Sequence, residues 1–237
     1  MTLEKLNQEM INYYNEIWRT AQLKNIPQNS DSTTKAAWKY KNFSGIENLI
    51  GDFLKKYPFN HKSILSIGCG AGKDVKKVKK LFPSANVYGI DTSRYALKEA
   101  KKYSDADFVC ASAEHLPLRD DIKFDGFIAG HTLDLSPNVN NAEKIISELT
   151  KHAAEKSRFY MTFYWDGPVD DGNCPDLELG VCTPVGNTLA KFGWWGKYEG
   201  TAYSLLGKSP YAEGVFWVEE RTLKPNRVLL KYRLNNC

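Results

Sequence analysis

Three alternate glycines follow a short apolar segment and come directly before a Lys-rich helical pattern. They are Gly68, Gly70 and Gly72, within residues 64–75. Because glycine has no Cβ, the backbone of such a turn can approach a ligand where a side chain would collide. In the dinucleotide fingerprint G-x-G-x-x-G the third glycine would come one residue later, where this chain has Lys73. The turn therefore predicts a nucleotide-type ligand other than NAD.

A carboxylate ends the next apolar segment, residues 87–91, at Asp91. A carboxylate at the end of a strand beside a glycine turn can accept hydrogen bonds from both hydroxyl groups of a ribose. Its negative charge disfavours a 2′-phosphate, which argues against NADP as well. We therefore expect a ligand that contains a ribose without a 2′-phosphate.

Short apolar segments alternate with helical patterns over the middle of the chain. Strands are predicted at 63–67, 86–91, 107–110, 124–129 and 157–163, and helices near 73–82, 93–103 and 141–155. Strands that alternate with helices need crossover connections and form a mainly parallel sheet with both faces covered. The pattern predicts a doubly wound α/β fold, in which ligands bind beyond the carboxyl ends of the strands.

The chain on either side of this alternation predicts further elements. Residues 2–24 carry apolar side chains at helical spacing, and a capping box at Ser44 and Glu47 begins a second helix. Residues 166–210 combine Gly, Pro and aromatic residues without clean periodicity, which predicts an irregular insertion at the mouth of the site. Residues 215–222 and 227–234 predict an antiparallel hairpin that closes the sheet.

Four motifs, in order, resemble those of the class I S-adenosylmethionine-dependent methyltransferases over about residues 60–165. Segment 68–72 is similar to the motif against the amino-acid part of the cofactor, and Asp91 to the ribose-binding acid. Segments 108–118 and 124–131 are similar to the adenine-binding segment and to the strand and loop below the sulfonium. The resemblance implies a Rossmann-like, doubly wound, seven-stranded sheet that is mainly parallel and ends in an antiparallel hairpin. Residues 1–58 would form an N-terminal helical lid, and residues 59–237 the methyltransferase-fold domain.

The resemblance also implies S-adenosyl-L-methionine as the cofactor and indicates which residues bind it. They are Gly68, Cys69, Gly70, Asp91, Thr92, Ser112, Ala113, Glu114 and Gly130. The chain departs from the family at Ser112, where many members have an acid that contacts adenine. The hydrogen bond to the adenine amino group would then come from Ser112, from a backbone carbonyl or through water. The exchange affects affinity by about 1–2 kcal/mol, the scale of one hydrogen bond to a neutral group.

Methyl transfer from a sulfonium is a one-step displacement, so in-line positioning supplies a large part of the acceleration. A general base is needed only where the acceptor must lose a proton early. His131, directly after the fourth predicted strand, is the candidate base, and Tyr164 on the fifth is a second candidate catalytic residue. Aromatic faces near a sulfonium add cation–π attraction. A structural role is the alternative for both residues.

Four more residues are candidates for the lid or for substrate binding. Asp134 follows the fourth predicted strand, and Asp166 has the same strand parity as Tyr164. Tyr14 lies in a segment similar to the tyrosine-containing lid helix of many small-molecule methyltransferases, and Trp38 follows it in the chain. Asp134 could instead cap a turn, and Tyr14 could simply be buried on the apolar face of its helix.

Composition excludes several classes of protein. The chain has 237 residues, 42% of them hydrophobic, which is enough for a core and excludes intrinsic disorder. Its longest stretch without a charged side chain, residues 179–190, is well short of the ~20 residues of a spanning helix. The start of the chain lacks the apolar core of a secretory signal, so we expect a cytoplasmic protein. The five cysteines have no zinc-finger or CxxC spacing, so we expect no metal site.

The leading interpretation is a small-molecule methyltransferase, because a helical lid and an aromatic insertion would cover a pocket. A nucleic-acid methyltransferase is disfavoured, since the loop after the fourth strand reads Ala129-Gly130-His131-Thr132 in place of an Asn/Asp-Pro-Pro-aromatic motif. The net charge of +4 is also small for a polynucleotide binder. Two alternatives stay open: an enzyme that cyclises or cleaves S-adenosylmethionine and releases methylthioadenosine, and a non-catalytic cofactor-binding subunit.

Overall fold

A computed structural model describes residues 3–31, 34–35, 37–38, 62–130, 132, 139–165, 192, 194–200 and 212–221 of the chain. The chain divides into two units, Met1–Leu116 and Pro117–Cys237. The expected boundary between a lid and a catalytic domain, near residue 58, lies outside the described residues and stays a prediction. Within those ranges, no helix is long and apolar enough to cross a membrane.

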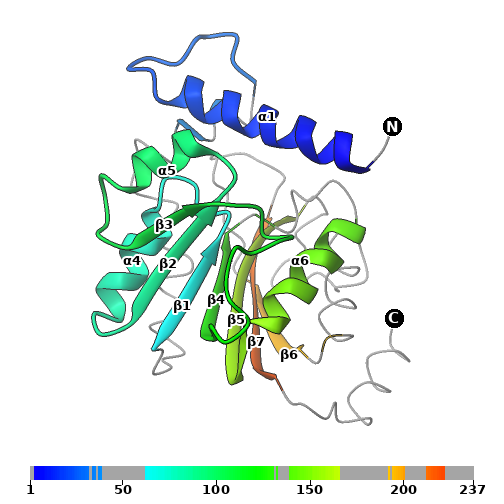
Figure 1. Cartoon of the computed structure of the whole chain (residues 1–237). Coiled ribbons are helices and arrows are strands. Elements are labelled where there is room, and N and C mark those ends of the chain that lie inside the picture. The colour runs from blue at the N-terminus through cyan, green and yellow to red at the C-terminus, as the bar shows by residue number, and fades with distance from the viewer. Residues whose placement is uncertain are drawn as a thin grey trace. The chain divides into compact units, whose positions relative to one another are not determined.

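Three parallel strands form the sheet of the first unit. β1 (Ser63–Ile67), β2 (Asn86–Asp91) and β3 (Asp107–Cys110) lie in the order β3-β2-β1. α4 (Lys73–Leu81) connects β1 to β2, and α5 (Arg94–Ala100) connects β2 to β3 (Figure 1). Ser93 caps α5 because its Oγ accepts a hydrogen bond from the N–H of Ala96 at 3.4 Å. The three strands occupy the residues that the sequence pattern predicts, so the carboxyl ends of neighbouring strands lie together.

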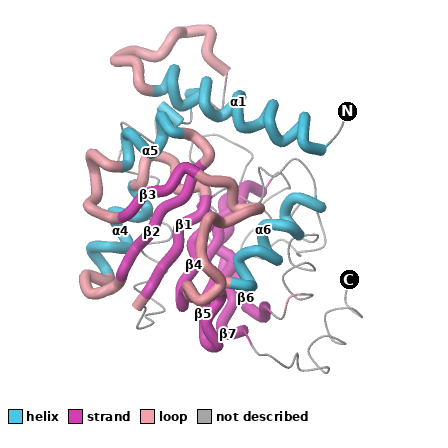
Figure 2. Tube along the Cα trace, in the orientation of Figure 1, coloured by secondary structure: helices cyan, strands magenta, loops and turns pink. Residues whose placement is uncertain are grey.

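The N-terminal helix α1 (Leu3–Ala21) packs against the same unit, alongside α5 (Figure 1). Among the α1 side chains that the structure describes, the buried ones are Ile17, Trp18 and Ala21, all in the last two turns. The loop that follows turns back along the helix (Figure 2), and Trp38 Nε1 donates to Leu23 O at 3.3 Å. The second expected helix, near residues 44–54, lies outside the described residues.

The second unit combines parallel and antiparallel strands. Its elements are β4 (Phe124–Gly130), α6 (Val139–Lys151), β5 (Ala153–Trp165), β6 (Trp194–Gly200) and β7 (Ala212–Arg221). β4 and β5 are parallel, whereas β7 pairs antiparallel with β5 on one side and with β6 on the other. The strand order within this unit is β4-β5-β7-β6.

α6 ends four residues earlier than the sequence predicts. Residues 153–156, two alanines followed by Glu and Lys, favour a helix by intrinsic propensity. They begin β5 instead, because Ala153 pairs with Phe124 of β4 and the N–H of Phe124 donates to His152 O at 2.8 Å. Pairing with a distant strand therefore overrides the local preference.

The prediction of an irregular segment over residues 166–210 is wrong at β6. Trp194, Trp195 and Tyr198 favour a strand, but Gly196 interrupts the alternation, and the register shifts there. The partner that stabilises β6 is β7, more than ten residues further along the chain. β7 overlaps the first half of the expected hairpin, residues 215–222, whereas the second half, 227–234, lies outside the described residues.

The core of the second unit is aromatic. Phe127 of β4, Phe159 of β5 and Trp194 of β6 contact one another edge to face, with ring centroids 5.7–6.0 Å apart. Trp194 Nε1 donates to Oγ1 of Thr150 on α6 at 2.8 Å. The ring cluster and this hydrogen bond join α6, β4, β5 and β6 into one packed body.

The burial of Tyr160 on β5 leads to a prediction of how the free energy of unfolding changes at alkaline pH. The residue is 1% exposed, and burial raises the pKa of Tyr160 to about 12. An unfolded tyrosine titrates near 10, so above that pH the unfolded chain releases a proton that the folded chain retains. We expect the wild type to lose up to about 2–3 kcal/mol of unfolding free energy from about pH 10 to about pH 12, and Tyr160→Phe to lose less.

Urea unfolding of the wild type and of Tyr160→Phe at several pH values gives the slope of the unfolding free energy against pH for each protein. Tyr13→Phe is the matched control, because Tyr13 is 44% exposed, and this variant should keep the wild-type slope. Equal slopes for wild type and Tyr160→Phe would contradict the prediction.

Candidate cofactor site

The glycine turn between β1 and α4 has a backbone that only glycine adopts readily. Gly68, Gly70 and Gly72 have φ values of 59°, 51° and 70°. A Cβ at Gly72, which precedes α4, would lie 2.7 Å from the Cβ of Ala100 on α5 and 3.1 Å from its Cα. The absence of side chains thus lets the turn pack closely on α5 and expose bare backbone to a ligand.

Asp91, at the end of β2, is held by two backbone donors. Its Oδ2 accepts the N–H of Gly70 at 2.9 Å, and its Oδ1 accepts the N–H of Ser93 at 2.8 Å. Burial raises the pKa of Asp91, and the hydrogen bonds from Ser93 and Gly70 offset part of that rise. Each carboxylate oxygen has a further lone pair. The carboxylate is therefore oriented in advance and able to accept two more hydrogen bonds.

The segment after β3 closes on the end of β2. The N–H of Ala111 donates to Asp91 O at 3.1 Å, and Cys110 Sγ contacts Thr92 O at 3.6 Å. Ser112 Oγ accepts the N–H of Glu114 at 3.2 Å. One lone pair and the hydroxyl proton of Ser112 remain for a ligand. Thr92 and residues 112–114 therefore lie with Asp91 at the carboxyl ends of β2 and β3.

The side chain of Cys69 is buried beneath the glycine turn. Its Sγ lies 2.9 Å from the position of a Cβ on Gly89, so the side chain packs on β2. Burial, together with the charges of Asp91 and Asp74, raises the pKa of the Cys69 thiol well above its usual range. Its N–H donates to Ile90 O at 3.0 Å. Cys69 therefore shapes the turn with a buried thiol and an N–H that donates within the protein, and its role in cofactor binding stays a prediction.

Trp18 of α1 contacts the same turn, and sequence analysis missed it. A Cβ on Gly70 would lie 2.9 Å from Trp18 Cζ2, and Trp18 packs with Ala21, Ala71 and Ala96. Tyr14, the lid residue predicted from the sequence, is partly buried one turn earlier on the same face. The spacing of four residues between Tyr14 and Trp18, which puts both on one face of the helix, is the sequence signal from which Trp18 could have been found. Trp38, the other predicted lid residue, is partly buried against this cluster.

The contact predicts that Gly70→Ala destabilises the protein. A non-glycine residue at φ 51° costs about 1–2 kcal/mol, and the new Cβ would meet the Trp18 ring at 2.9 Å. We expect the thermal unfolding temperature to fall by about 2–8 °C. The double variant Gly70→Ala, Trp18→Phe should lose less than the sum of the two single losses, because the smaller ring removes the collision. A wild-type unfolding temperature for Gly70→Ala would refute the contact.

The remaining predicted residues lie in the second unit or outside the described ranges. Gly130 ends β4, and Tyr164 lies on β5 opposite Glu213 of β7. His131, Asp134 and Asp166 are outside the described residues, so their roles stay predictions. Among the side chains that are described, no group of three His, Cys, Asp or Glu is placed to hold a metal ion.

Comparisons with known proteins relate this geometry to a family. A family model described as a methyltransferase domain matches residues 65–161, from β1 into β5. No curated protein matches the chain.

Three of the similar solved structures cover almost the whole chain. Magnesium protoporphyrin IX methyltransferase from Synechocystis PCC 6803, with bound S-adenosylmethionine, has a TM-score of 0.62 at 16% identity over 90% of this chain and 96% of its own. Plantazolicin methyltransferase, with S-adenosylhomocysteine, has 0.54 at 16% identity over 90% and 99%. A structure described by the conversion of a disulfide bond into a thioacetal group during echinomycin biosynthesis has 0.65 at 15% identity over 96% and 98%.

At these identities the likeness shows the fold, which is the Rossmann-like α/β fold of the methyltransferases. The strand orders β3-β2-β1 and β4-β5 within the two units agree with it. The glycine turn, Asp91 and the segment after β3 all lie within the residues that the family model matches. Residues 65–161 of this chain are therefore a class I S-adenosylmethionine-dependent methyltransferase domain.

Proposed function

We propose that the chain transfers the methyl group of S-adenosylmethionine to a small-molecule acceptor. The observation that carries this proposal is the packing of α1 on the glycine turn through Trp18 and Gly70. A helix in that position covers one end of the cofactor site, which favours an enclosed pocket over an open groove for a polymer. Two similar structures are methyltransferases named for magnesium protoporphyrin IX and for plantazolicin, not for a nucleic acid.

The residues of the first unit fit this cofactor. The bare backbone of Gly68 and Gly70 would lie against its amino-acid part, where a Cβ on Gly70 would already meet Trp18 at 2.9 Å. The free lone pairs of Asp91 would accept the ribose hydroxyls, and residues 112–114 would contact the adenine. When bound, S-adenosylmethionine supplies an electrophilic methyl group on a positively charged sulfur. The chain's own contribution is to fix the direction of that methyl group, because in-line positioning supplies most of the acceleration.

The other roles in this proposal rest on the resemblance of the sequence to the family. His131 and Tyr164 would act on the acceptor, and Gly130 would lie below the sulfonium. Tyr14 and Trp38 would belong to the lid, and Asp134 and Asp166 to the acceptor site. In this proposal residues 1–58 serve as the lid of a cytoplasmic enzyme, and residues 59–237 form the seven-stranded methyltransferase domain.

Incubation with S-adenosylmethionine, alone and with pooled small-molecule extracts, tests the proposal. Mass spectrometry follows the adenosine-containing products. S-adenosylhomocysteine that forms only with extract is the expected result, and the product that gains 14 mass units identifies the acceptor class. Methylthioadenosine that forms without extract would overturn methyl transfer in favour of a cyclase or lyase. Binding without any product would indicate a non-catalytic subunit.

A further inference from the structure

A buried oxygen on α1 accepts no hydrogen bond from the residues that the structure describes. This atom is Oδ1 of Asn15. A buried acceptor without a donor carries the full cost of its lost hydration, and folded proteins keep few such atoms. Its presence on a helix that packs against a ligand site points to a donor that the ligand provides.

Asn15 lies on the face of α1 that covers the glycine turn. Trp18, three residues later, contacts Gly70, and residues three apart share one face of a helix. Gly70 in turn directs its N–H to Asp91 at 2.9 Å, while its Cα faces Trp18. Asp91 and Trp18 therefore approach Gly70 from two sides, and Asn15 shares the helix face of Trp18.

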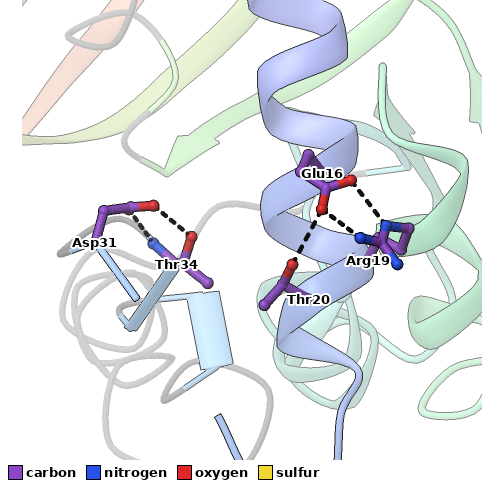
Figure 3. A network of polar contacts seen from close by, with 5 residues as sticks. All are labelled: Glu16, Arg19, Thr20, Asp31 and Thr34. Carbon is purple, nitrogen blue, oxygen red and sulfur yellow. Dashed lines mark hydrogen bonds and ion pairs between the residues drawn. The ribbon is translucent and has the colours of Figure 1, made fainter. Parts of the chain in front are cut away.

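Several exposed polar side chains of α1 form hydrogen bonds with one another. Glu16 accepts hydrogen bonds from Arg19 Nε at 2.8 Å and from Thr20 Oγ1 at 3.5 Å (Figure 3). Figure 3 also shows Asp31, beyond the helix, accepting from Thr34 Oγ1 at 2.8 Å. One turn before Glu16, the exposed Asn12 Oδ1 accepts from Gln8 Nε2 at 3.1 Å. Among the described side chains of α1, the exposed Asn12 thus has a donor for its Oδ1, whereas the buried Oδ1 of Asn15 has none.

The chemistry of the cofactor decides which of its groups suits this oxygen. With the ribose at Asp91 and the amino-acid part against the glycine turn, as proposed above, the amino-acid part would lie beside the turn that α1 contacts through Trp18. Its α-ammonium group has three N–H donors and no acceptor, whereas its α-carboxylate has only acceptors. We infer that Asn15 Oδ1 accepts a hydrogen bond from the α-ammonium group of S-adenosylmethionine. The inference rests on the proposed function, and it makes α1 part of the cofactor site as well as its cover.

Two substitutions at Asn15 separate this role from a structural one. Asn15→Leu is similar in size and removes the unsatisfied oxygen, so the unfolding temperature of the free protein should be retained or rise. Affinity for S-adenosylhomocysteine should nevertheless fall about 10- to 100-fold, the effect of one hydrogen bond to a charged group. Asn15→Asp keeps an acceptor and adds a negative charge, so it should bind at least as tightly as the wild type. Asn12→Leu and Asn12→Asp are the matched controls and should bind within about twofold of the wild type.

A ligand variant completes a double-mutant cycle. Desamino-S-adenosylhomocysteine, in which hydrogen replaces the α-ammonium group, should bind the wild type and Asn15→Leu equally weakly. Titration calorimetry measures all four affinities. Independent, additive losses would overturn the inference, as would weaker binding by Asn15→Asp than by Asn15→Leu, because that order would place the α-carboxylate at Asn15.

The outcomes also distinguish this inference from the proposed function. If the wild type binds S-adenosylhomocysteine and every Asn15 variant binds it equally well, only the inference fails. If the wild type does not bind S-adenosylhomocysteine, the proposed function fails and the inference fails with it.

Discussion

Asp91→Ala should weaken binding of S-adenosylhomocysteine by at least about 100-fold. The carboxylate would accept both ribose hydroxyls, and each hydrogen bond to a charged group contributes about 1.5–3 kcal/mol. Its removal also releases the N–H of Gly70, which the structure holds at 2.9 Å from Asp91 Oδ2. The loss therefore combines missing ligand contacts with a less ordered turn. Titration calorimetry on the purified variant measures it.

The same carboxylate predicts how cofactor binding depends on pH. The ionised form accepts hydrogen bonds, and burial raises the pKa of Asp91 in the free protein. Affinity should therefore fall as the pH falls, and the fall should begin at a higher pH than it would for an exposed aspartate. Asp91→Asn, which cannot ionise, should bind weakly and lack this pH dependence.

A control variant separates the effect of the site from that of a lost charge. Asp107→Ala removes an exposed carboxylate at the start of β3 in the same unit and should leave the affinity within about twofold of the wild type. Thermal unfolding confirms that each variant is folded before the affinities are compared. Unchanged affinity in folded Asp91→Ala would refute the placement of the ribose, and with it the cofactor site.

Trp194→Ala should lower the free energy of unfolding by about 3–5 kcal/mol. The side chain is 1% exposed and contacts Phe127 and Phe159, with ring centroids 5.8 Å and 5.7 Å away. Truncation would leave a cavity and remove the donor from Thr150 Oγ1, now 2.8 Å from Trp194 Nε1. A loss of that size is a large part of the stability of an ordinary domain. Urea unfolding, followed by circular dichroism, measures it.

Trp194→Phe separates the contribution of the aromatic ring from that of the hydrogen bond donated by Nε1. It keeps an aromatic ring in the cluster but has no N–H, so it should recover more than half of the loss seen with alanine. Because Trp194 begins β6, this result also tests whether β6 packs in the core of the second unit. A loss below about 1 kcal/mol for Trp194→Ala would mean that β6 does not contribute to that core.

The local features of the cofactor site follow from the sequence itself. β1, β2 and β3 lie where alternating apolar segments predict them. β1 and β2 bury apolar residues, whereas β3 is more exposed and extends the sheet by pairing with β2. Gly70 and Gly72 lie where backbone must approach another atom, and Asp91 ends its strand. These features depend on residues close together in the chain. Periodicity and residue type are therefore sufficient to predict them.

The features that the sequence missed all depend on contacts between distant segments. α6 ends at Lys151 because Ala153 pairs with Phe124, although the local residues favour a longer helix. β6 exists because β7 pairs with it across more than ten intervening residues, and Trp194 contributes to its packing by contacting rings on two other strands.

Sequence by itself therefore determined the fold family, the cofactor class and the residues of the glycine turn. Only the tertiary structure decided that Cys69 packs its thiol on β2 and that Trp18 contacts Gly70. It also decided that Asn15 buries an oxygen with no donor among the described residues. The physical reason for this difference is that residue type and spacing define only which face of a helix or strand is apolar. What that face meets is decided by segments far away in the chain, through packing and hydrogen bonds that no local pattern contains.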